Sequence, residues 1–459
     1  MRDFLPPPLL SAEEEGPNSR ERVFPLRLTF ECFVWQILKP KTPCREVVRQ
    51  VQALFRLAGR GRIDEGDSAY VQARLRLPQE RLEMALSATA QAADDRAGQA
   101  GQINGRPVIV VDGSSTQLAD TSENQKLYPQ PSTQKSGCGF PVMKLVALMS
   151  LSSGAVLNVA LGNLHYHDLR LLRTLWDKLK TGAILLGDRA YGEFTTLAGL
   201  LKQGIEAVAR LHHARKVDFR KARRLGRNDG LFVWTKGCQQ SQILSPSEWA
   251  LLPAQITVRI IRFTATIRGF RSRRITLVTT LLDPKLYPAQ ELVQLYARRW
   301  RLELCLRDLK TTMGMEALRC KTPDMVQKEL LAYLVAHNLV RCLIAEAVAR
   351  YSVDLERVSF KGSLDALRQY SDAIAKARSK RMRGQLWEDC CSTWPGTWYA
   401  IGLTAPSPGP SSAAPNPTPC STSPAGVSSK SLIAAAIGKA APAIFGALTK
   451  GHSGRFLVL

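Results

Sequence analysis

The chain has 459 residues, more than one typical domain needs, so it can bury an enzyme-sized core and need not be a small binding module. Its 63 Lys and Arg residues exceed its 39 Asp and Glu residues, which leaves a formal net charge of +24 that is spread along the chain. This excess favours a polyanionic partner such as nucleic acid over a merely alkaline surface.

The ten cysteines are scattered without any Cys-x-x-Cys pair, so the sequence contains neither a zinc ribbon nor a recognisable disulfide framework. The N-terminus has three prolines and an acidic residue where a signal peptide needs a continuous apolar run. His337, Arg341 and Lys439 interrupt the most apolar stretches before they reach the length of a membrane helix. We therefore expect a cytoplasmic, nucleoid-associated protein with no membrane partner.

The N-terminal fifth of the chain changes from a polar leader to a helical pattern. Residues 1–22 have no apolar period and are expected to be mobile. Residues 23–100 predict amphipathic helices at 29–38, 44–57, 68–75 and 78–92. Arginines lie among these helices at Arg45, Arg49, Arg56, Arg60, Arg62, Arg74, Arg76 and Arg81. We predict a helical DNA-binding domain that presents arginines to phosphates, with ordinary solvated helix faces as the alternative.

Residues 101–211 have the pattern of an α/β unit. The predicted strands are 108–111, 144–151, 155–161, 183–187 and 205–211, and the predicted helices are 169–179 and 193–203. Three strands in a meander, followed by helix, strand, helix and strand, is the order of an RNase H-like core. We predict the first part of such a core here.

The remainder of the chain divides into three parts. Residues 212–285 alternate as β-hairpins do, which predicts a β-rich insertion. Helical periodicity returns in residues 286–391, which we expect to complete the RNase H-like core and to add C-terminal helices. Residues 392–459 are rich in Pro, Ser and Ala and contain no acidic residue, as is typical of a low-complexity tail.

Two aspartates follow predicted strands directly. Asp112 ends the strand at 108–111, and Asp188 ends the strand at 183–187. Open α/β sheets bind ligands at such strand ends, where two carboxylates can converge on divalent metal ions. Each aspartate could instead be a turn or capping residue.

A third motif lies in the predicted helix near residue 300. Tyr296, Arg299, Glu303 and Lys310 stand at offsets of 0, 3, 7 and 14, which places their directions within roughly 60° around one helix. Burying a tyrosine, two cations and a carboxylate on one face is costly, so this face is a poor core face. A solvated charged face remains the alternative, because the same helix also carries charge on its other sides.

The order of these motifs resembles the bacterial insertion-sequence transposases that have a DDE triad and a YREK signature. The resemblance is carried by Asp112-Gly113, by Gly187-Asp188-Arg189-Ala190-Tyr191, and by Tyr-x2-Arg-x3-Glu-x6-Lys from Tyr296 to Lys310. It extends over roughly residues 25–350 and implies a transposase that cuts the ends of an insertion sequence and joins them to target DNA.

The resemblance also implies roles for individual residues. Asp112, Asp188 and Glu303 would bind two Mg²⁺ or Mn²⁺ ions that promote attack at phosphorus. Tyr296, Arg299 and Lys310 would grip phosphates near the cleaved end. Double-stranded DNA, both the terminal inverted repeats and the target, is the implied partner of a homodimer.

Several neighbouring residues are further candidates for this site. We expect Arg189 to contact DNA and Trp300 to stack on an unpaired base, whereas core packing is favoured for Trp234. Capping, solvated or other structural roles are favoured over metal binding for a further set: Asp120, Glu123, His165, His167 and Asp168.

Two other functions stay open at this point. The unusual tail allows a catalytically impaired transposase remnant or inhibitor that still binds DNA. An RNase H-like cellular nuclease is the second alternative, although the helical N-terminal region favours binding to specific DNA ends.

Overall fold

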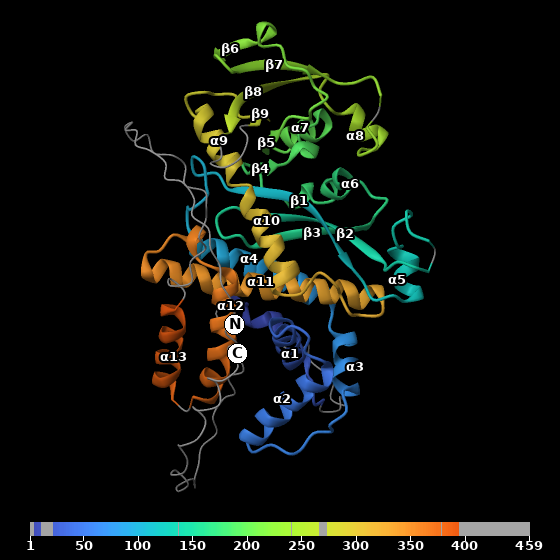
Figure 1. Cartoon of the computed structure of the whole chain (residues 1–459), viewed down its shortest axis with the longest axis vertical. Coiled ribbons are helices and arrows are strands. Elements are labelled where there is room, and N and C mark those ends of the chain that lie inside the picture. The colour runs from blue at the N-terminus through green and yellow to red at the C-terminus, as the bar shows by residue number, and fades with distance from the viewer. Residues whose placement is uncertain are drawn as a thin grey trace, which may run out of the picture. The chain divides into compact units, whose positions relative to one another are not determined.

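The computed structural model describes residues 4–10, 22–135, 137–239, 241–265, 273–377 and 379–393, all within one structural unit. Most of the predicted leader and almost all of the predicted low-complexity tail lie outside these residues. Figure 1 shows a twisted sheet with helices on both faces and a group of helices at one end.

Four predicted N-terminal helices are confirmed. They are α1 (Leu26–Leu38), α2 (Cys44–Leu57), α3 (Ser68–Arg76) and α4 (Gln79–Ala97), preceded by the 3₁₀ turn η2 (Pro7–Leu10). Pro25, Pro43 and Pro78 stand just before α1, α2 and α4, where a residue without an N–H loses no helical hydrogen bond. These prolines therefore mark where the helices begin.

The arginines of this region divide into exposed and buried ones. On α2, Arg45 and Arg49 are exposed while the valines between them are buried, so the helix turns its cations to solvent. Arg74 is 8% exposed, stacks 4.2 Å from the centroid of the Phe33 ring and donates to Cys320 Sγ at 3.1 Å. The prediction that Arg74 faces phosphates is wrong, because α3 turns this side chain into the protein.

The sheet has nine strands in the order β3-β2-β1-β4-β5-β9-β8-β7-β6. Its first five strands are β1 (Val108–Gln117), β2 (Val142–Ser150), β3 (Val156–Asn163), β4 (Ile184–Gly187) and β5 (Glu206–Arg210). β1, β2 and β3 form an antiparallel meander, β4 is parallel to β1, and β5 is parallel to β4. This arrangement is the predicted RNase H-like core.

The predicted β-rich insertion forms the other end of the same sheet (Figure 1). It comprises η5 (Phe219–Lys221), β6 (Arg223–Gly226), β7 (Asp229–Thr235), α8 (Pro246–Ala250), β8 (Gln255–Ala265) and β9 (Arg273–Thr279). β9 pairs antiparallel with β5, so the insertion continues the core sheet instead of forming a separate one.

Helices cover both faces of the core strands. One face is covered by α6 (Asp168–Arg173), η3 (Trp176–Lys178), η4 (Arg189–Tyr191) and α7 (Phe194–Lys202). The opposite face is covered by α4, by α9 (Ala289–Ala297) and α10 (Trp300–Arg307), and by α11 (Pro323–Tyr351). The central strands have continuous apolar sequences because alternate side chains pack into the two hydrophobic cores on opposite faces of the sheet.

Helix α11 is long and apolar enough to span a membrane by length and composition, but 83% of its most apolar window is buried within the protein. It packs along α4, which accounts for its apolar surface as that of a core helix. The remaining elements are α5 (Ser122–Leu127), the π turn η6 (Asp308–Thr312), η7 (Leu355–Arg357), α12 (Phe360–Lys376) and α13 (Lys380–Ser392).

Strand β1 is longer than the sequence predicts. It continues past Asp112 to Gln117, because β2 pairs with it over its whole length, whereas its pairing with β4 ends at Val110. Asp112 therefore lies within a strand and not at its end. It follows shortly after Val110, the last residue of β1 that pairs with both β2 and β4.

A buried ion pair lies within the insertion, and its arginine also reaches the segment that leads into α9. The Arg259 side chain is 1% exposed, and it donates to Asp229 Oδ1 at 2.8 Å and to the Tyr287 carbonyl at 2.6 Å. Replacing Asp229 by Ala leaves this guanidinium buried without its counter-charge, so we expect Asp229→Ala to cost roughly 3–5 kcal/mol.

Thermal denaturation of purified variants measures this cost. The matched control is Asp218→Ala, because Asp218 pairs with Arg220, whose side chain is 84% exposed, and its loss is expected to leave the Tm nearly unchanged. Equal Tm values for the two variants would show that the buried ion pair contributes no more to stability than the exposed one.

Candidate active site

Asp112 and Asp188 occupy equivalent positions on neighbouring parallel strands. Val110 of β1 is in register with Leu186 of β4, so two residues further along each strand bring the two aspartates side by side. Strand alternation places both carboxylates on the face that α9 and α10 cover. The predicted meeting of the two aspartates at one place on the sheet follows from this register.

Glu303 reaches the same place from α10, which packs against β1. Arg299 connects the two elements: its Nη2 donates to Glu303 Oε1 at 2.8 Å, and its Nη1 lies 3.8 Å from Asp112 Oδ2. The Arg299 side chain is 12% exposed. Two carboxylates separated by 191 positions in the chain (303 − 112) therefore share one partly buried cation.

Tyr296 completes the constellation from the last turn of α9. Its hydroxyl donates to Asp188 Oδ1 at 3.2 Å, and the Arg299 guanidinium lies 5.8 Å from the centroid of its ring. The structure thus brings together Asp112, Asp188, Glu303, Tyr296 and Arg299, which we call the acidic constellation.

The electrostatics of the acidic constellation are dominated by burial. Burial raises the pKa of Asp112, and the negative charges of Glu303 and Asp188 raise it further. The Gly113 N–H, which donates to Asp112 Oδ1 at 2.9 Å, and the Arg299 cation both lower this pKa. Burial and the Asp188 charge also raise the pKa of Tyr296, so its hydroxyl remains a donor.

The prediction of one continuous helix carrying the whole signature is wrong. Helix α9 ends at Ala297, Arg299 lies in a helical turn, and α10 begins at Trp300. Lys310 then falls in the π turn η6, whose extra residue changes the direction of the side chains that follow. Among residues 273–377, no hydrogen bond or ion pair links the Lys310 side chain to Glu303.

The neighbouring candidates have different surroundings. The Trp300 side chain is 55% exposed beside Arg299, and Arg189 Nη1 lies 3.5 Å from His213 Nδ1. Trp234 is 6% exposed beneath the guanidinium of Arg215, which confirms its predicted core packing. Roles for Trp300 and Arg189 on DNA stay predictions.

Several of the residues for which structural roles are favoured make local contacts. His167 caps α6 by accepting from the Leu169 N–H at 3.3 Å, and Asp120 accepts from Gln125, which confirms local roles for both. Asp168 is the first residue of α6 and not its cap: its side chain is 30% exposed, pairs with Lys144 at 2.7 Å and lies against Gly113. The glycine after Asp112 was the available signal, since a strand glycine often marks a close approach.

The acidic constellation has the donor chemistry of a site for a hard divalent cation. Within the parts of the chain that the structure describes, no three His, Cys, Asp or Glu side chains could hold a metal ion as they stand. The cation between Asp112 and Glu303 is instead the Arg299 guanidinium. Carboxylate oxygens are the ligands that Mg²⁺ and Mn²⁺ take, so the side-chain types of the acidic constellation suit such an ion, although their present arrangement holds a guanidinium instead.

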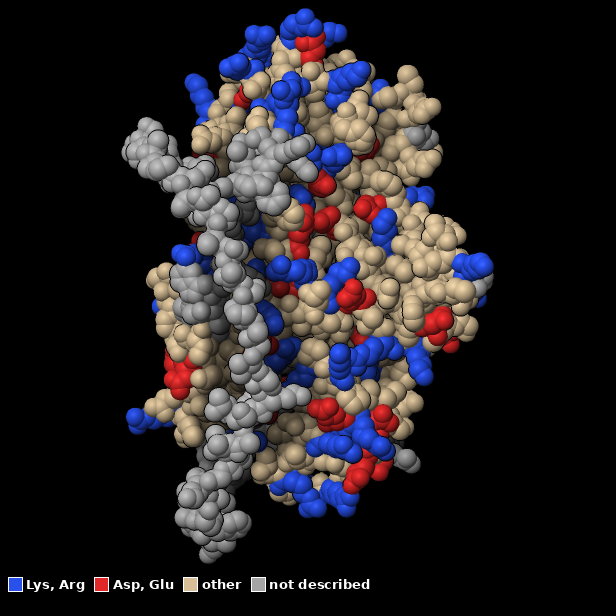
Figure 2. All heavy atoms as spheres, viewed as in Figure 1, with Lys and Arg blue, Asp and Glu red and all other residues tan. Residues whose placement is uncertain are grey.

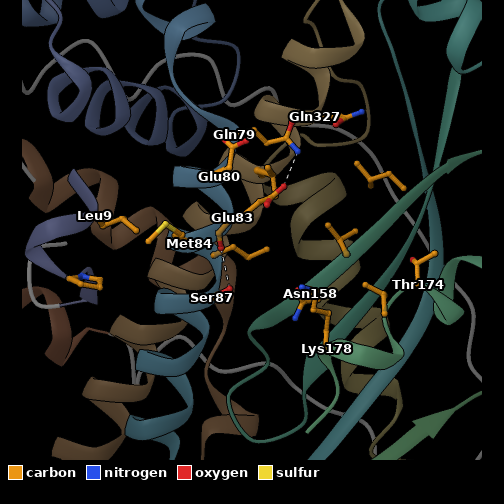
Figure 3. A pocket seen from close by; sticks show the side chains of 16 residues that line it. Leu9, Gln79, Glu80, Glu83, Met84, Ser87, Asn158, Thr174, Lys178 and Gln327 are labelled. Carbon is orange, nitrogen blue, oxygen red and sulfur yellow. Dashed lines mark hydrogen bonds between the residues drawn. The ribbon is translucent and has the colours of Figure 1, made fainter. Parts of the chain in front are cut away.

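A separate cavity of about 660 Å³ lies between α4, β3 and the segment around η3 (Figure 3). Gln79 and Glu83 of α4 are hydrogen-bonded at its wall, and Asn158 and Lys178 line the other side. No residue of the acidic constellation lines this cavity. The constellation is therefore distinct from it.

The fold and the acidic constellation together define the class of RNase H-like proteins with two aspartates on neighbouring strands and a glutamate on a covering helix. A family model described as "Transposase DDE domain" matches residues 103–339, more than half of the chain. The chain belongs to this family, and its class is that of a DNA-acting transposase.

The relatives include other insertion-sequence proteins. The chain is 28% identical over 346 residues to the transposase InsG for insertion sequence element IS4 of Escherichia coli (strain K12), which covers 74% of this chain and 75% of that protein. It is 32% identical over 68 residues to the putative transposase InsL for insertion sequence element IS186A of the same strain, which covers 15% and 18%.

Among solved structures, the piggyBac transposase synaptic complex with hairpin DNA aligns with a TM-score of 0.41 and 8% identity. The alignment covers 87% of this chain and 81% of that chain.

The position of Arg299 predicts a titration shift at Asp112. Arg299→Gln removes the cation that lowers the pKa of Asp112, so we expect this pKa to rise further above its ordinary value. ¹³C NMR of carboxyl-labelled aspartate, without metal and with Asp112→Asn for assignment, measures the midpoint. An unchanged midpoint would mean that the guanidinium does not lie beside Asp112.

Proposed function

We propose that this chain is a DNA transposase that uses two Mg²⁺ or Mn²⁺ ions, held by Asp112, Asp188 and Glu303, to cut and join DNA at the ends of an insertion sequence. The observation that carries the proposal is the acidic constellation, in which Arg299 links Glu303 to Asp112 while Tyr296 binds Asp188. A carboxylate whose pKa is raised by burial and which has a specific charged partner is a recognised mark of a functional site, and Asp112 has both properties.

The three carboxylates supply negative charge and oxygen ligands on one face of the sheet. When bound there, a pair of divalent ions supplies activation of the attacking oxygen and stabilisation of the leaving oxygen at phosphorus. The protein's own contribution is to hold its ligands in place. β1 and β4 fix the two aspartates, and the packing of α10 on β1 fixes Glu303.

Arg299 has two successive partners in this proposal. Without DNA it offsets part of the negative charge of Asp112 and Glu303, and with DNA its planar fork binds a phosphate near the scissile bond. Trp300 is the next residue and is exposed, so an unpaired base at the DNA end can stack on it. Arg189 and Lys310 are proposed to contact the DNA backbone further from the reacting phosphate.

The rest of the surface supports binding to long DNA. The net charge is +24, and Figure 2 shows Lys and Arg side chains across the visible face of the described residues. Exposed Arg45 and Arg49 on α2 suit sequence-independent contacts to phosphates. A homodimer would bring two element ends to one target, and such a complex would act at the nucleoid.

The alternatives lose support at this point. Family membership favours a transposase over a cellular nuclease. A catalytically impaired remnant has less support because all three acidic residues are present, with Asp112 and Glu303 beside Arg299 and Asp188 hydrogen-bonded to Tyr296. Both alternatives remain outcomes of the experiment that follows.

Cleavage of DNA that carries the terminal inverted repeats tests the proposal. In Mg²⁺ or Mn²⁺ we expect the purified chain to nick such DNA, and we expect Asp188→Asn to reduce nicking by roughly 10³-fold or more, because metal assistance is worth several kcal/mol. DNA binding, measured by fluorescence anisotropy, should remain.

The matched control is Asp120→Asn, the same substitution at an exposed aspartate outside the acidic constellation. It should nick as the parent chain does. Nicking by Asp188→Asn at the parent rate would refute the assignment of the metal ligands, and a parent chain that binds the ends but never nicks would support the impaired remnant.

A further inference from the structure

A strongly basic segment leads from β5 into β6. Residues 215–227 contain seven Lys and Arg residues and a single acidic residue, Asp218. All seven cations are exposed, and we call them the basic ridge: Arg215, Lys216, Arg220, Lys221, Arg223, Arg224 and Arg227. Within the part of the chain that the structure describes, Arg220 is the one member that forms an ion pair, with Asp218. The other six cations face solvent without a fixed carboxylate partner.

Aromatic side chains of β7 hold the backbone of the basic ridge in place. The Arg215 guanidinium lies 3.9 Å from the centroid of the Trp234 ring, and Phe219 of η5 packs edge-on against Phe232, with ring centroids 5.7 Å apart. Strand β6 itself pairs antiparallel with β7. The backbone that carries the cations is therefore already ordered, so a ligand with a regular array of negative charges need not order it on binding.

The basic ridge begins close to the acidic constellation. The register of β4 with β5 places Arg210, the last residue of β5, beside Asp188. Three residues further along the chain, His213 Nδ1 lies 3.5 Å from Arg189 Nη1. From there the ridge follows the chain to β6, which is an outermost strand of the sheet. The cations thus lead away from the reacting groups toward one edge of the sheet.

The N-terminal helices lie toward the other edge. β3 is the opposite outermost strand, and α4 packs on it. The acidic constellation, on β1 and β4, therefore lies between the N-terminal helices and the basic ridge (Figure 1). Figure 2 shows Lys and Arg side chains at the end of the described residues where Figure 1 draws β6. DNA that is held by the N-terminal helices and crosses the constellation would reach the ridge only after it passes the reacting groups.

We propose that the basic ridge binds phosphates of the DNA outside the insertion sequence, on the far side of the scissile phosphate from the terminal repeat. This inference rests on the proposed function and on binding of the repeat by the N-terminal helices. From β4 to β6 the sheet crosses five strand spacings of about 4.8 Å, or roughly 24 Å. Duplex DNA rises about 3.4 Å per base pair, so the ridge reaches phosphates up to roughly 7 base pairs beyond the cleaved bond.

A purely structural role for these arginines would have different consequences. Cations on an outermost strand can prevent that strand from pairing with another chain, whether or not DNA is bound. Loss of this role alone would promote self-association and leave the affinity for DNA unchanged. In the proposed role, the loss of the cations weakens binding only to DNA that continues past the cleaved bond.

The experiment compares two duplexes by fluorescence anisotropy, with the full chain in EDTA so that no cleavage occurs. One duplex carries the terminal repeat and ends at the cleavage site, and the other continues about 15 base pairs beyond it, roughly twice the reach of the ridge. Arg223→Gln/Arg224→Gln/Arg227→Gln should bind the first duplex as the parent chain does and the second more weakly. The slope of log affinity against log salt concentration for the second duplex should fall in magnitude by about 3, roughly one for each lost phosphate contact.

The matched control removes the same charge from exposed residues of α12 and α13, at the opposite end of the described residues (Figure 1): Lys376→Gln/Lys380→Gln/Arg381→Gln. It should bind both duplexes as the parent chain does. Three results would overturn the inference: equal weakening on both duplexes, equal weakening by the control variant, or an unchanged salt slope on the longer duplex.

Thermal denaturation checks the folding of each variant. If the triple variant of β6 does not fold, Lys216→Gln/Lys221→Gln leaves β6 unaltered and should lower the magnitude of the salt slope by about 2 on the longer duplex alone. Failure of the proposed function looks different. A parent chain that binds the longer duplex through the ridge but does not nick it in Mg²⁺ or Mn²⁺ would refute the proposed function and leave this inference in place.

Discussion

The contact on which the rest of the structure depends is that of the Arg299 guanidinium with the carboxylates of Asp112 and Glu303. Like charges brought together in a partly buried place repel each other, and each loses hydration. Arg299 offsets both costs, at 2.8 Å from Glu303 and 3.8 Å from Asp112. The same contact links α10 to β1, so one side chain both joins two parts of the acidic constellation and offsets part of its negative charge.

The sheet supplies the precision that this contact needs. β1 and β4 are parallel and buried on both faces, so their register fixes Asp112 beside Asp188. The insertion continues the sheet from β5, and the buried Arg259 ties it to the segment before α9. Elements far from the reacting groups therefore hold the helix from which Tyr296 donates to Asp188.

Much of this fold could be predicted from the sequence, because apolar runs and helical periods are local signals. The order of strands in the core and the four N-terminal helices followed from them. The extension of β1 past Asp112 could not be predicted, since it depends on pairing with β2. Nor could the burial of Arg74, which depends on Phe33 and Cys320 in other segments.

The candidate site shows the same division. Asp112, Asp188 and Glu303 could be selected because strand ends and fixed spacings are visible in sequence. The π turn at Lys310 and the approach of Asp168 to Gly113 arise from tertiary packing and have only weak local signals. The pair Asp112-Gly113 after an apolar strand is such a signal. Only the structure shows that Asp168 occupies the space that a side chain at Gly113 would fill.

The most direct test of the central claim replaces the divalent ion with Fe²⁺ in the chain bound to DNA and generates hydroxyl radicals at the ion. Such radicals cut the backbone within a few ångströms of their source. The account predicts cuts at three places in one molecule, near residues 112, 188 and 303. Cuts near 112 and 188 without any near 303 would contradict it, because Glu303 would then not share the ion with the two aspartates.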